Sequence, residues 1–94
     1  MARILSETDL QKALQDLPGW TLEQGQLSRT IKFKDFPDAI AFVDRIVDPA
    51  EEANHHPDID IRWNTVTLRL FTHSQKALTD KDIALARKIS LLCS

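Results

Sequence analysis

Residues 59–70 read Ile-Asp-Ile-Arg-Trp-Asn-Thr-Val-Thr-Leu-Arg-Leu and predict a β-hairpin. Large apolar side chains alternate with polar ones on both sides of Asn64-Thr65, a pattern typical of two half-buried strands. A two-residue turn at Asn64-Thr65 would pair Trp63 with Val66 and place all the large apolar side chains on one face. The six side chains are those of Ile59, Ile61, Trp63, Val66, Leu68 and Leu70. The opposite face would then pair Asp60 with Arg69, two opposite charges.

A second hairpin and three helices are predicted around this hairpin. Alternation over residues 20–34, interrupted at Gln24-Gly25, predicts two further strands. Apolar residues at three- and four-residue steps predict helices over 6–17, 35–47 and 79–92. The residues that can cap these helices are Ser6, Asp35 and Thr79.

The middle helix meets a proline before it reaches the histidines. Proline lacks an amide donor and disfavours helix in the residue before it, but Asp48 followed by Glu51 can also cap a new helix. The sequence therefore predicts a kink or a restart at Asp48-Pro49.

The predicted order is α-β-β-α-β-β-α in a single domain, residues 1–94. Two hairpins most simply share one four-stranded antiparallel sheet with three helices on one face, which is an α+β two-layer sandwich. A chain of 94 residues with 43% apolar residues can build one core of this kind. The other face of the sheet, where we expect Arg29 and Phe71, is predicted to be solvated or to meet another chain.

Charge and hydropathy exclude two classes of partner. Twelve Lys and Arg residues against 14 Asp and Glu residues give a net charge of -2, without the basic stripe that nucleic acid requires. No apolar run approaches the roughly 20 residues that span a bilayer, and Glu7 and Asp9 stand too early for a signal peptide. We therefore expect a cytoplasmic protein that binds neither nucleic acid nor membrane.

The three histidines of the chain are predicted to meet at the open end of the hairpin. The predicted register extends to set His56 opposite His73, and His55 directly precedes His56. Pro57 disfavours helix in His56 and so places the histidine pair at a junction between helix and strand.

Three histidines at one place allow acid–base chemistry. Imidazole changes charge near neutral pH, so two positioned rings can act as acid and base in a dehydration or a tautomerisation. Three imidazoles can also ligate zinc, but adjacent histidines usually point in different directions, and we predict no metal site. The alternative is that the histidines have no function and are solvated residues whose hydrogen bonds are satisfied by neighbouring groups.

Two carboxylates can reach these rings. Asp82 begins the last helix shortly after His73, and Glu51 lies one helical turn before His55. Spacing alone names no substrate.

A long pattern in the sequence resembles that of the pterin-4a-carbinolamine dehydratases, also called 4a-hydroxytetrahydrobiopterin dehydratases. It consists of Glu51, His55-His56-Pro57, Trp63, His73 and Asp82, and supporting similarity covers nearly the whole chain. The resemblance implies an α+β domain and a hydro-lyase that converts the 4a-carbinolamine of a tetrahydropterin to quinonoid dihydropterin. That product is then reduced, which recycles tetrahydrobiopterin for aromatic amino acid hydroxylases. No metal or organic cofactor is implied.

The resemblance also implies roles for single residues. His55, His56 and His73 would line the pterin pocket, with Asp82 beside them. We expect His55 and His73 to protonate the departing hydroxyl and to accept the N5 proton, in an order left open, and His56 to hold the ring. Asp82 would orient an imidazole, favour the helix dipole, or do both.

Two motif members are expected to support the site. Trp63 is predicted to lie in the core rather than to stack on the substrate. Glu51 is predicted to act beside the histidine pair, although Glu52 is placed equally well.

Two residues depart from the family pattern. Asn54 stands where the animal enzymes frequently have an acidic residue, which puts a carboxylate partner at that position in doubt. Pro49 breaks a segment that resembles a continuous helix of the family.

The resemblance implies a homodimer or homotetramer. It also implies an alternative function as a non-catalytic dimeric binding module, since animal members act as coactivators of a homeodomain transcription factor through a helix that otherwise serves self-association. The apolar stripe that could serve this contact is Phe36, Ile40, Val43 and Val47, and we expect it to face the core. A third possibility is action on another pterin where no pterin-dependent hydroxylase exists.

Overall fold

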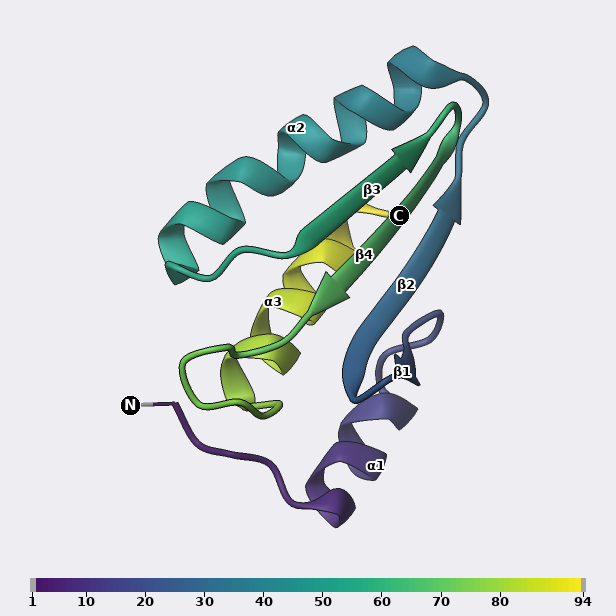
Figure 1. Ribbon diagram of the computed structural model, residues 1–94. Coiled ribbons are helices and arrows are strands. Elements are labelled where there is room, and N and C mark those ends of the chain that lie inside the picture. Colours follow the sequence, from purple (N-terminus) through teal and green to yellow (C-terminus); the bar gives the residue numbers. More distant parts are fainter. Residues whose placement is uncertain (1, 94) are drawn as a thin grey trace.

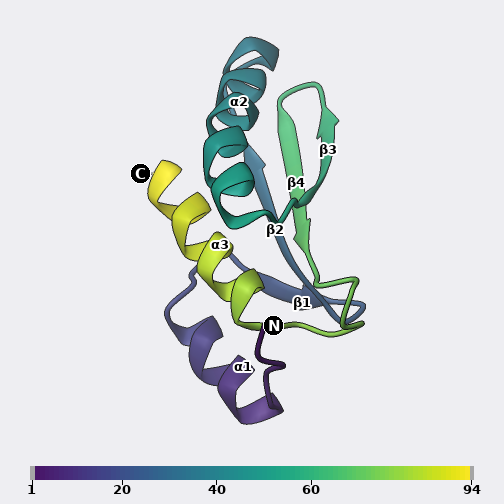
Figure 2. The ribbon, with the colours of Figure 1, turned by 90° about the vertical axis from the view of Figure 1, so that its left-hand side faces the viewer.

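The computed structural model describes residues 2–93 (Figure 1). Its elements are α1 (Glu7–Gln15), β1 (Thr21–Glu23), β2 (Gln26–Lys32), α2 (Phe36–Ala53), β3 (Asp58–Arg62), β4 (Thr65–Leu70) and α3 (Asp80–Leu92). The four strands form one antiparallel sheet in the order β1-β2-β4-β3. Figure 2 shows the three helices on one side of this sheet, so the predicted α+β two-layer sandwich is confirmed. None of the helices within residues 2–93 combines the length and the apolar character needed to cross a membrane.

Each helix starts at its predicted cap. The side chains of Ser6 and Asp35 each accept a hydrogen bond from the amide three residues further on, at 3.1 and 3.0 Å. Thr79 and Asp82 form the predicted capping box at the start of α3. The capping box fixes Asp82 in the first turn of α3.

Helix α2 runs without interruption across Pro49, so the predicted restart is wrong. Pro49 removes one helical hydrogen bond, the one that its amide would donate to the carbonyl of Arg45. Ile46 and Ala50 are buried on either side of the proline, and their burial stabilises the continuous helix. The helix ends at Asn54, whose left-handed conformation (φ 48°) returns its amide to the last helical carbonyls.

The hairpin of β3 and β4 is shifted by two residues from its predicted register. Its turn is Trp63-Asn64, and Ile61 pairs with Val66 rather than with Leu68. Because the shift is even, the apolar residues of both strands stay on the face that packs against the helices. The predicted pair of Asp60 with Arg69 is wrong, since Asp60 lies opposite a threonine.

The buried side chain of Asn64 determines this turn. Its Nδ2 donates to the carbonyl of Phe33 at 2.9 Å, and the Phe33 amide donates to the carbonyl of Asn64 at 2.7 Å. Both bonds need Asn64 at the turn. Trp63 therefore occupies the turn with a left-handed backbone (φ 52°) and a 69% exposed side chain, so its predicted core position is wrong.

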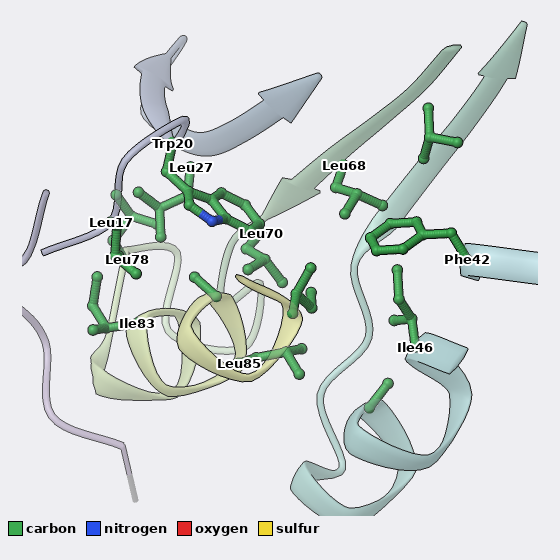
Figure 3. Packing of buried hydrophobic residues seen from close by; sticks show 14 of the residues in the cluster. Leu17, Trp20, Leu27, Phe42, Ile46, Leu68, Leu70, Leu78, Ile83 and Leu85 are labelled. Carbon is green, nitrogen blue, oxygen red and sulfur yellow. The ribbon is translucent and has the colours of Figure 1, made fainter. Parts of the chain in front are cut away.

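The core fills the space between the sheet and the helices (Figure 3). Figure 3 shows Phe42 and Ile46 of α2 directed toward Leu68 of β4. The buried residues of α2 are Ala39, Phe42, Ile46 and Ala50. The predicted inward stripe is wrong for Phe36 and Val47, which are 49% and 53% exposed. The face of α2 that carries Ala39, Phe42, Ile46 and Ala50 packs inward, which leaves Phe36 and Val47 outside while Val43 still packs against the core.

Arg29 lies on the helix side of the sheet, not on the open face as expected. Its Nη1 donates to the hydroxyl of Ser90 in α3 at 3.2 Å, and the indole of Trp20 donates to the same oxygen at 2.9 Å. The reason is parity, because Arg29 shares the face of its strand with Leu27 and Ile31. The open face instead carries the contact between the hydroxyls of Thr30 and Thr67.

Candidate active site

The end of α2, the end of β4 and the start of α3 surround a cavity of about 410 Å³. Its walls are formed by Asn54, His55, His56, Phe71, Thr72, His73, Ser74 and Lys81. All three histidines therefore meet at one place, but not through an extended ladder, because the pairing of β3 with β4 begins only at Asp58. A tight turn instead delivers His73, since Thr72 bridges to Ala77 and reverses the chain.

His55 is held from inside the protein. Its side chain is nearly enclosed, the residue being 8% exposed, and its Nε2 lies 2.5 Å from Oδ1 of Asp82. The backbone directs it inward, because the left-handed Asn54 ends the helix and the His55 amide donates to the carbonyl of Ala50 at 3.1 Å.

Asp82 is completely buried and accepts hydrogen bonds through both oxygens. Its Oδ2 accepts from the hydroxyl of Thr72 at 2.8 Å and from the amide of Thr79 at 2.9 Å. The Thr72 hydroxyl lies 2.7 Å from that of Thr79, and because its proton goes to Asp82, the Thr79 hydroxyl must be the donor. Asp82 is thus both the capping residue of α3 and the partner of His55.

This network determines which nitrogen of His55 faces the cavity. The ionised carboxylate of Asp82 can only accept, so the neutral ring of His55 carries its proton on Nε2. Every fully buried side-chain nitrogen or oxygen within residues 2–93 makes a hydrogen bond, whereas Nδ1 of His55 makes none, so this atom is not fully buried. Nδ1 is therefore open to the cavity and can accept a proton.

His56 has a carboxylate partner of a different kind. Its Nε2 lies 2.5 Å from Oε2 of Glu51, and both side chains are exposed. Glu51 rather than Glu52 is therefore the carboxylate beside the histidine pair. Water screens this pair, so it orients the ring of His56 more than it stabilises the fold. His56 also lines a neighbouring apolar cavity of about 270 Å³.

His73 lies at the exposed side of the cavity. Its ring meets the ring of Phe71 edge-on, with centroids 5.1 Å apart and an angle of 70° between the planes. Within the described residues no carboxylate forms an ion pair with His73. The three histidines therefore occupy different environments: one tied to a buried carboxylate, one to an exposed carboxylate, and one against an aromatic ring.

Sequence reasoning missed several residues of this site. Phe71, Ser74 and Lys81 line the cavity, and Thr72 orients Asp82, but none was predicted there. Thr72 and Lys81 are sequence neighbours of His73 and Asp82, and this is the signal that could have found them. Trp63, in contrast, lies at the turn of the hairpin, at the opposite end of β3 from the cavity (Figure 1).

Metal ligation finds no support in the described residues. No group of three or more His, Cys, Asp or Glu side chains within residues 2–93 is arranged to hold a metal ion. Nε2 of His55 and Nε2 of His56 are instead each bonded to a carboxylate.

Comparison with known proteins identifies the family. The family model described as pterin 4 alpha carbinolamine dehydratase matches residues 3–92. The chain belongs to this family. The resemblance seen in the sequence is confirmed, and the pterin-4-alpha-carbinolamine dehydratases are hydro-lyases, as expected.

Relatives of similar length support this membership. A protein from Nocardia farcinica, provisionally named a pterin-4-alpha-carbinolamine dehydratase, is 55% identical over 89 residues, which cover 95% of this chain and 94% of the relative. A protein of the same provisional name from Herpetosiphon aurantiacus is 54% identical over 86 residues, covering 92% and 90% of the two chains.

Solved structures share the fold. A crystal structure from Brucella melitensis, described as a transcriptional coactivator/pterin dehydratase, matches with a TM-score of 0.92 and 35% identity over 98% of this chain and all of its own. A pterin dehydratase-like protein described as a RuBisCO assembly factor in the alpha-carboxysome matches with a TM-score of 0.62 and 20% identity over 78% of this chain and 84% of its own. The second likeness concerns the fold alone.

Proposed function

We propose that this protein dehydrates the 4a-carbinolamine of a tetrahydropterin to quinonoid dihydropterin and so supports tetrahydropterin recycling. The observation that carries the proposal is the cavity that gathers His55, His56 and His73. In the reaction the bond between C4a and the hydroxyl oxygen breaks, N5 loses a proton, and one water molecule leaves. The balance requires one acid and one base, with no oxidant, reductant or cofactor.

His55 is the base in this proposal. Its Nδ1 is open to the cavity and unprotonated in the neutral ring, because Nε2 donates to Asp82. When Nδ1 accepts the N5 proton, the resulting imidazolium lies against a buried carboxylate, which stabilises its charge. Asp82 is therefore a positioning residue that acts through His55.

His73 is the acid, and His56 holds the pterin. An imidazolium at His73 would donate to the departing 4a-hydroxyl, which then leaves as water rather than as hydroxide. Because His55 takes the N5 proton, positive charge does not accumulate on the pterin. Phe71, which packs against the ring of His73, gives the cavity an apolar wall suited to the bicyclic substrate. His56, oriented by Glu51, would hydrogen-bond the pterin ring.

Stopped-flow absorbance tests this function. We expect the wild-type protein at micromolar concentration to accelerate the loss of the carbinolamine well above its rate in buffer. Free imidazole at three times the protein concentration is the control, because it supplies the same titrating groups without their arrangement. A rate no faster than with imidazole would contradict the proposal.

The proposal includes self-association as a homodimer or homotetramer. The exposed apolar side chains of Val47 on α2 and Ile59 on β3, which line one apolar cavity, and that of Phe36 at the start of α2 support it, because exposed apolar surface marks interfaces. The same surface favours the second candidate function, a binding module or coactivator, which the description of the Brucella melitensis structure also suggests. The cytoplasmic location remains a prediction.

Val47→Asp tests this surface. A buried, unpaired carboxylate would oppose an apolar interface, so we expect the variant to elute as a species near the 10.7 kDa monomer while the wild type elutes at a multiple of it. The measurement is size-exclusion chromatography with light scattering. Ala41→Asp adds the same charge to an exposed position on another side of α2 and should leave the oligomer intact. Equal masses for wild type and Val47→Asp would contradict an interface at this surface.

A further inference from the structure

Lys81 lies in the walls of two cavities at once. It lines the histidine cavity, and it also lines a larger cleft of about 600 Å³ between α1, α3 and the segment that precedes α1. The histidine cavity therefore adjoins a second space, with Lys81 between them. A ligand that extends from the histidines to Lys81 therefore reaches a residue that also lines the cleft.

The cleft contains more unpaired cations than unpaired carboxylates. Arg3 is paired with Asp9 at 2.9 Å, and Asp80 accepts the backbone amide of Arg3 at 3.1 Å. Among the charged side chains lining the cleft, those without an ion pair inside residues 2–93 are Lys12, Lys81, Arg87, Asp16 and Asp80. Three cations against two carboxylates leave an excess of positive charge, and Asp80 already accepts a backbone amide, so the cleft favours an anionic occupant.

Lys81 is also the cation of the histidine cavity that remains free to bind. Its Nζ lies 3.5 Å from the backbone carbonyl of Asn54, which is long for a hydrogen bond. The carboxylates beside the cavity are already engaged, Asp82 with His55 and Glu51 with His56. None of them neutralises Lys81 in the part of the chain that the structure describes.

We propose that this site takes pterins whose C6 side chain carries an anionic group, a phosphate or a carboxylate, and that Lys81 selects for that group. The inference rests on the proposed function, in which N5 loses its proton beside the histidines. C6 is bonded directly to N5, so a C6 side chain leaves the ring next to the reacting atoms and meets the cavity wall there. A chain directed past Lys81 continues into the cleft toward Lys12 and Arg87.

Binding of stable dihydropterins tests this selection. The three probes are 7,8-dihydropterins with the same hydroxylated C6 chain, which is neutral in one, ends in a phosphate monoester in the second, and ends in a carboxylate in the third. By isothermal titration we expect wild type to bind at least one anionic probe roughly tenfold tighter than the neutral one, since hydrogen bonds to charged groups are strong and partial exposure weakens them. This advantage should shrink as salt is added.

Two variants separate a local contact from net charge. Lys81→Gln should lower the affinity ratio of the anionic to the neutral probe to roughly twofold or less. Lys88→Gln removes the same charge from an exposed position of α3 outside both cavities and should retain the advantage. The phosphate and carboxylate probes show which anion the site prefers.

Three results would overturn the inference. They are equal affinity of wild type for all three probes, an advantage that survives in Lys81→Gln, and an advantage that disappears equally in Lys88→Gln. Failure of the proposed function is distinguishable, because it appears as an absence of turnover for the neutral and the anionic carbinolamines alike. Turnover of the neutral carbinolamine without an anionic preference would refute only the selection by Lys81.

Discussion

Asp82→Asn is expected to lower the rate of carbinolamine dehydration by roughly a thousandfold, within the range by which a positioned acid or base accelerates reactions. The same change should lower the free energy of unfolding by about 3 kcal/mol, because it disrupts a buried group that accepts three hydrogen bonds. Both effects have the same cause. The side-chain amide of asparagine matches the carboxylate in shape, but its NH₂ group places two N–H donors where a carboxylate oxygen accepted a hydrogen bond.

The geometry determines where the new amide nitrogen must point. Oδ2 of Asp82 accepts from the backbone amide of Thr79, a donor that cannot turn away. The carbonyl oxygen of the asparagine therefore keeps that position, and its NH₂ faces Nε2 of His55. His55 must then accept through Nε2 and carry its proton on Nδ1. The nitrogen that faces the cavity becomes a donor and can no longer take the proton from N5.

Asp80→Asn is the matched control, because Asp80 lies two residues earlier in the same helical turn and is exposed. It should retain turnover and most of the stability. Stopped-flow rates report turnover, and urea unfolding reports stability. The ¹⁵N shifts of the imidazole nitrogens report which nitrogen of His55 carries the proton. Unchanged turnover in Asp82→Asn with the His55 proton still on Nε2 would contradict the assignment of Asp82 as the residue that positions the base.

The faces of the β3–β4 hairpin could be predicted from the sequence, but its register could not. Alternation specifies which side chains share a face, and an even shift leaves the faces unchanged. Two hydrogen bonds between Asn64 and Phe33, which lie far apart in the sequence, determine the position of the turn. No local pattern in residues 59–70 contains that contact, and for this reason the sequence predicts Trp63 in the core although it lies exposed at the turn.

For helix α2 too, the sequence predicts the element but not all of its tertiary contacts. The capping residue Asp35 and the apolar periodicity are local signals, and both were interpreted correctly. These signals do not predict which face of the helix is buried, because that depends on how closely Ala39 and Ala50 allow the helix to approach its neighbours. The helix continues through Pro49, since the loss of one hydrogen bond is small beside the burial of Ile46 and Ala50.

The meeting of the histidines was predicted from a register that is wrong by two residues. It occurs nonetheless, because the chain reversals at Asn54 and after Thr72 bring the two histidine segments to the start of α3. The capping box made Asp82 recognisable in the sequence. For Thr72 and Lys81 the sequence offers only their position beside His73 and Asp82, since their contacts with Asp82 and the cavity arise from tertiary packing.

Removal of either proposed proton-transfer group should lower the dehydration rate by roughly 10²- to 10⁴-fold. His73→Ala removes an exposed ring and should cost little stability. His55→Ala would leave the buried Asp82 without its partner, and the loss of folding could then be mistaken for a loss of catalysis. His55→Gln is the better variant, because its amide can still donate to Asp82 but cannot take up a proton near neutral pH.

The double variant distinguishes cooperation from independent contributions. If His55 and His73 move their protons in one transition state, the loss of either already abolishes that route, and His55→Gln with His73→Ala should be little slower than the slower single variant. His56→Ala changes the same residue type in the same cavity and should mainly raise KM, since His56 is assigned to binding. Stopped-flow absorbance measures all four variants. Unchanged rates in both single variants would remove the proposed acid and base, and fully multiplicative losses would show that the two rings contribute independently.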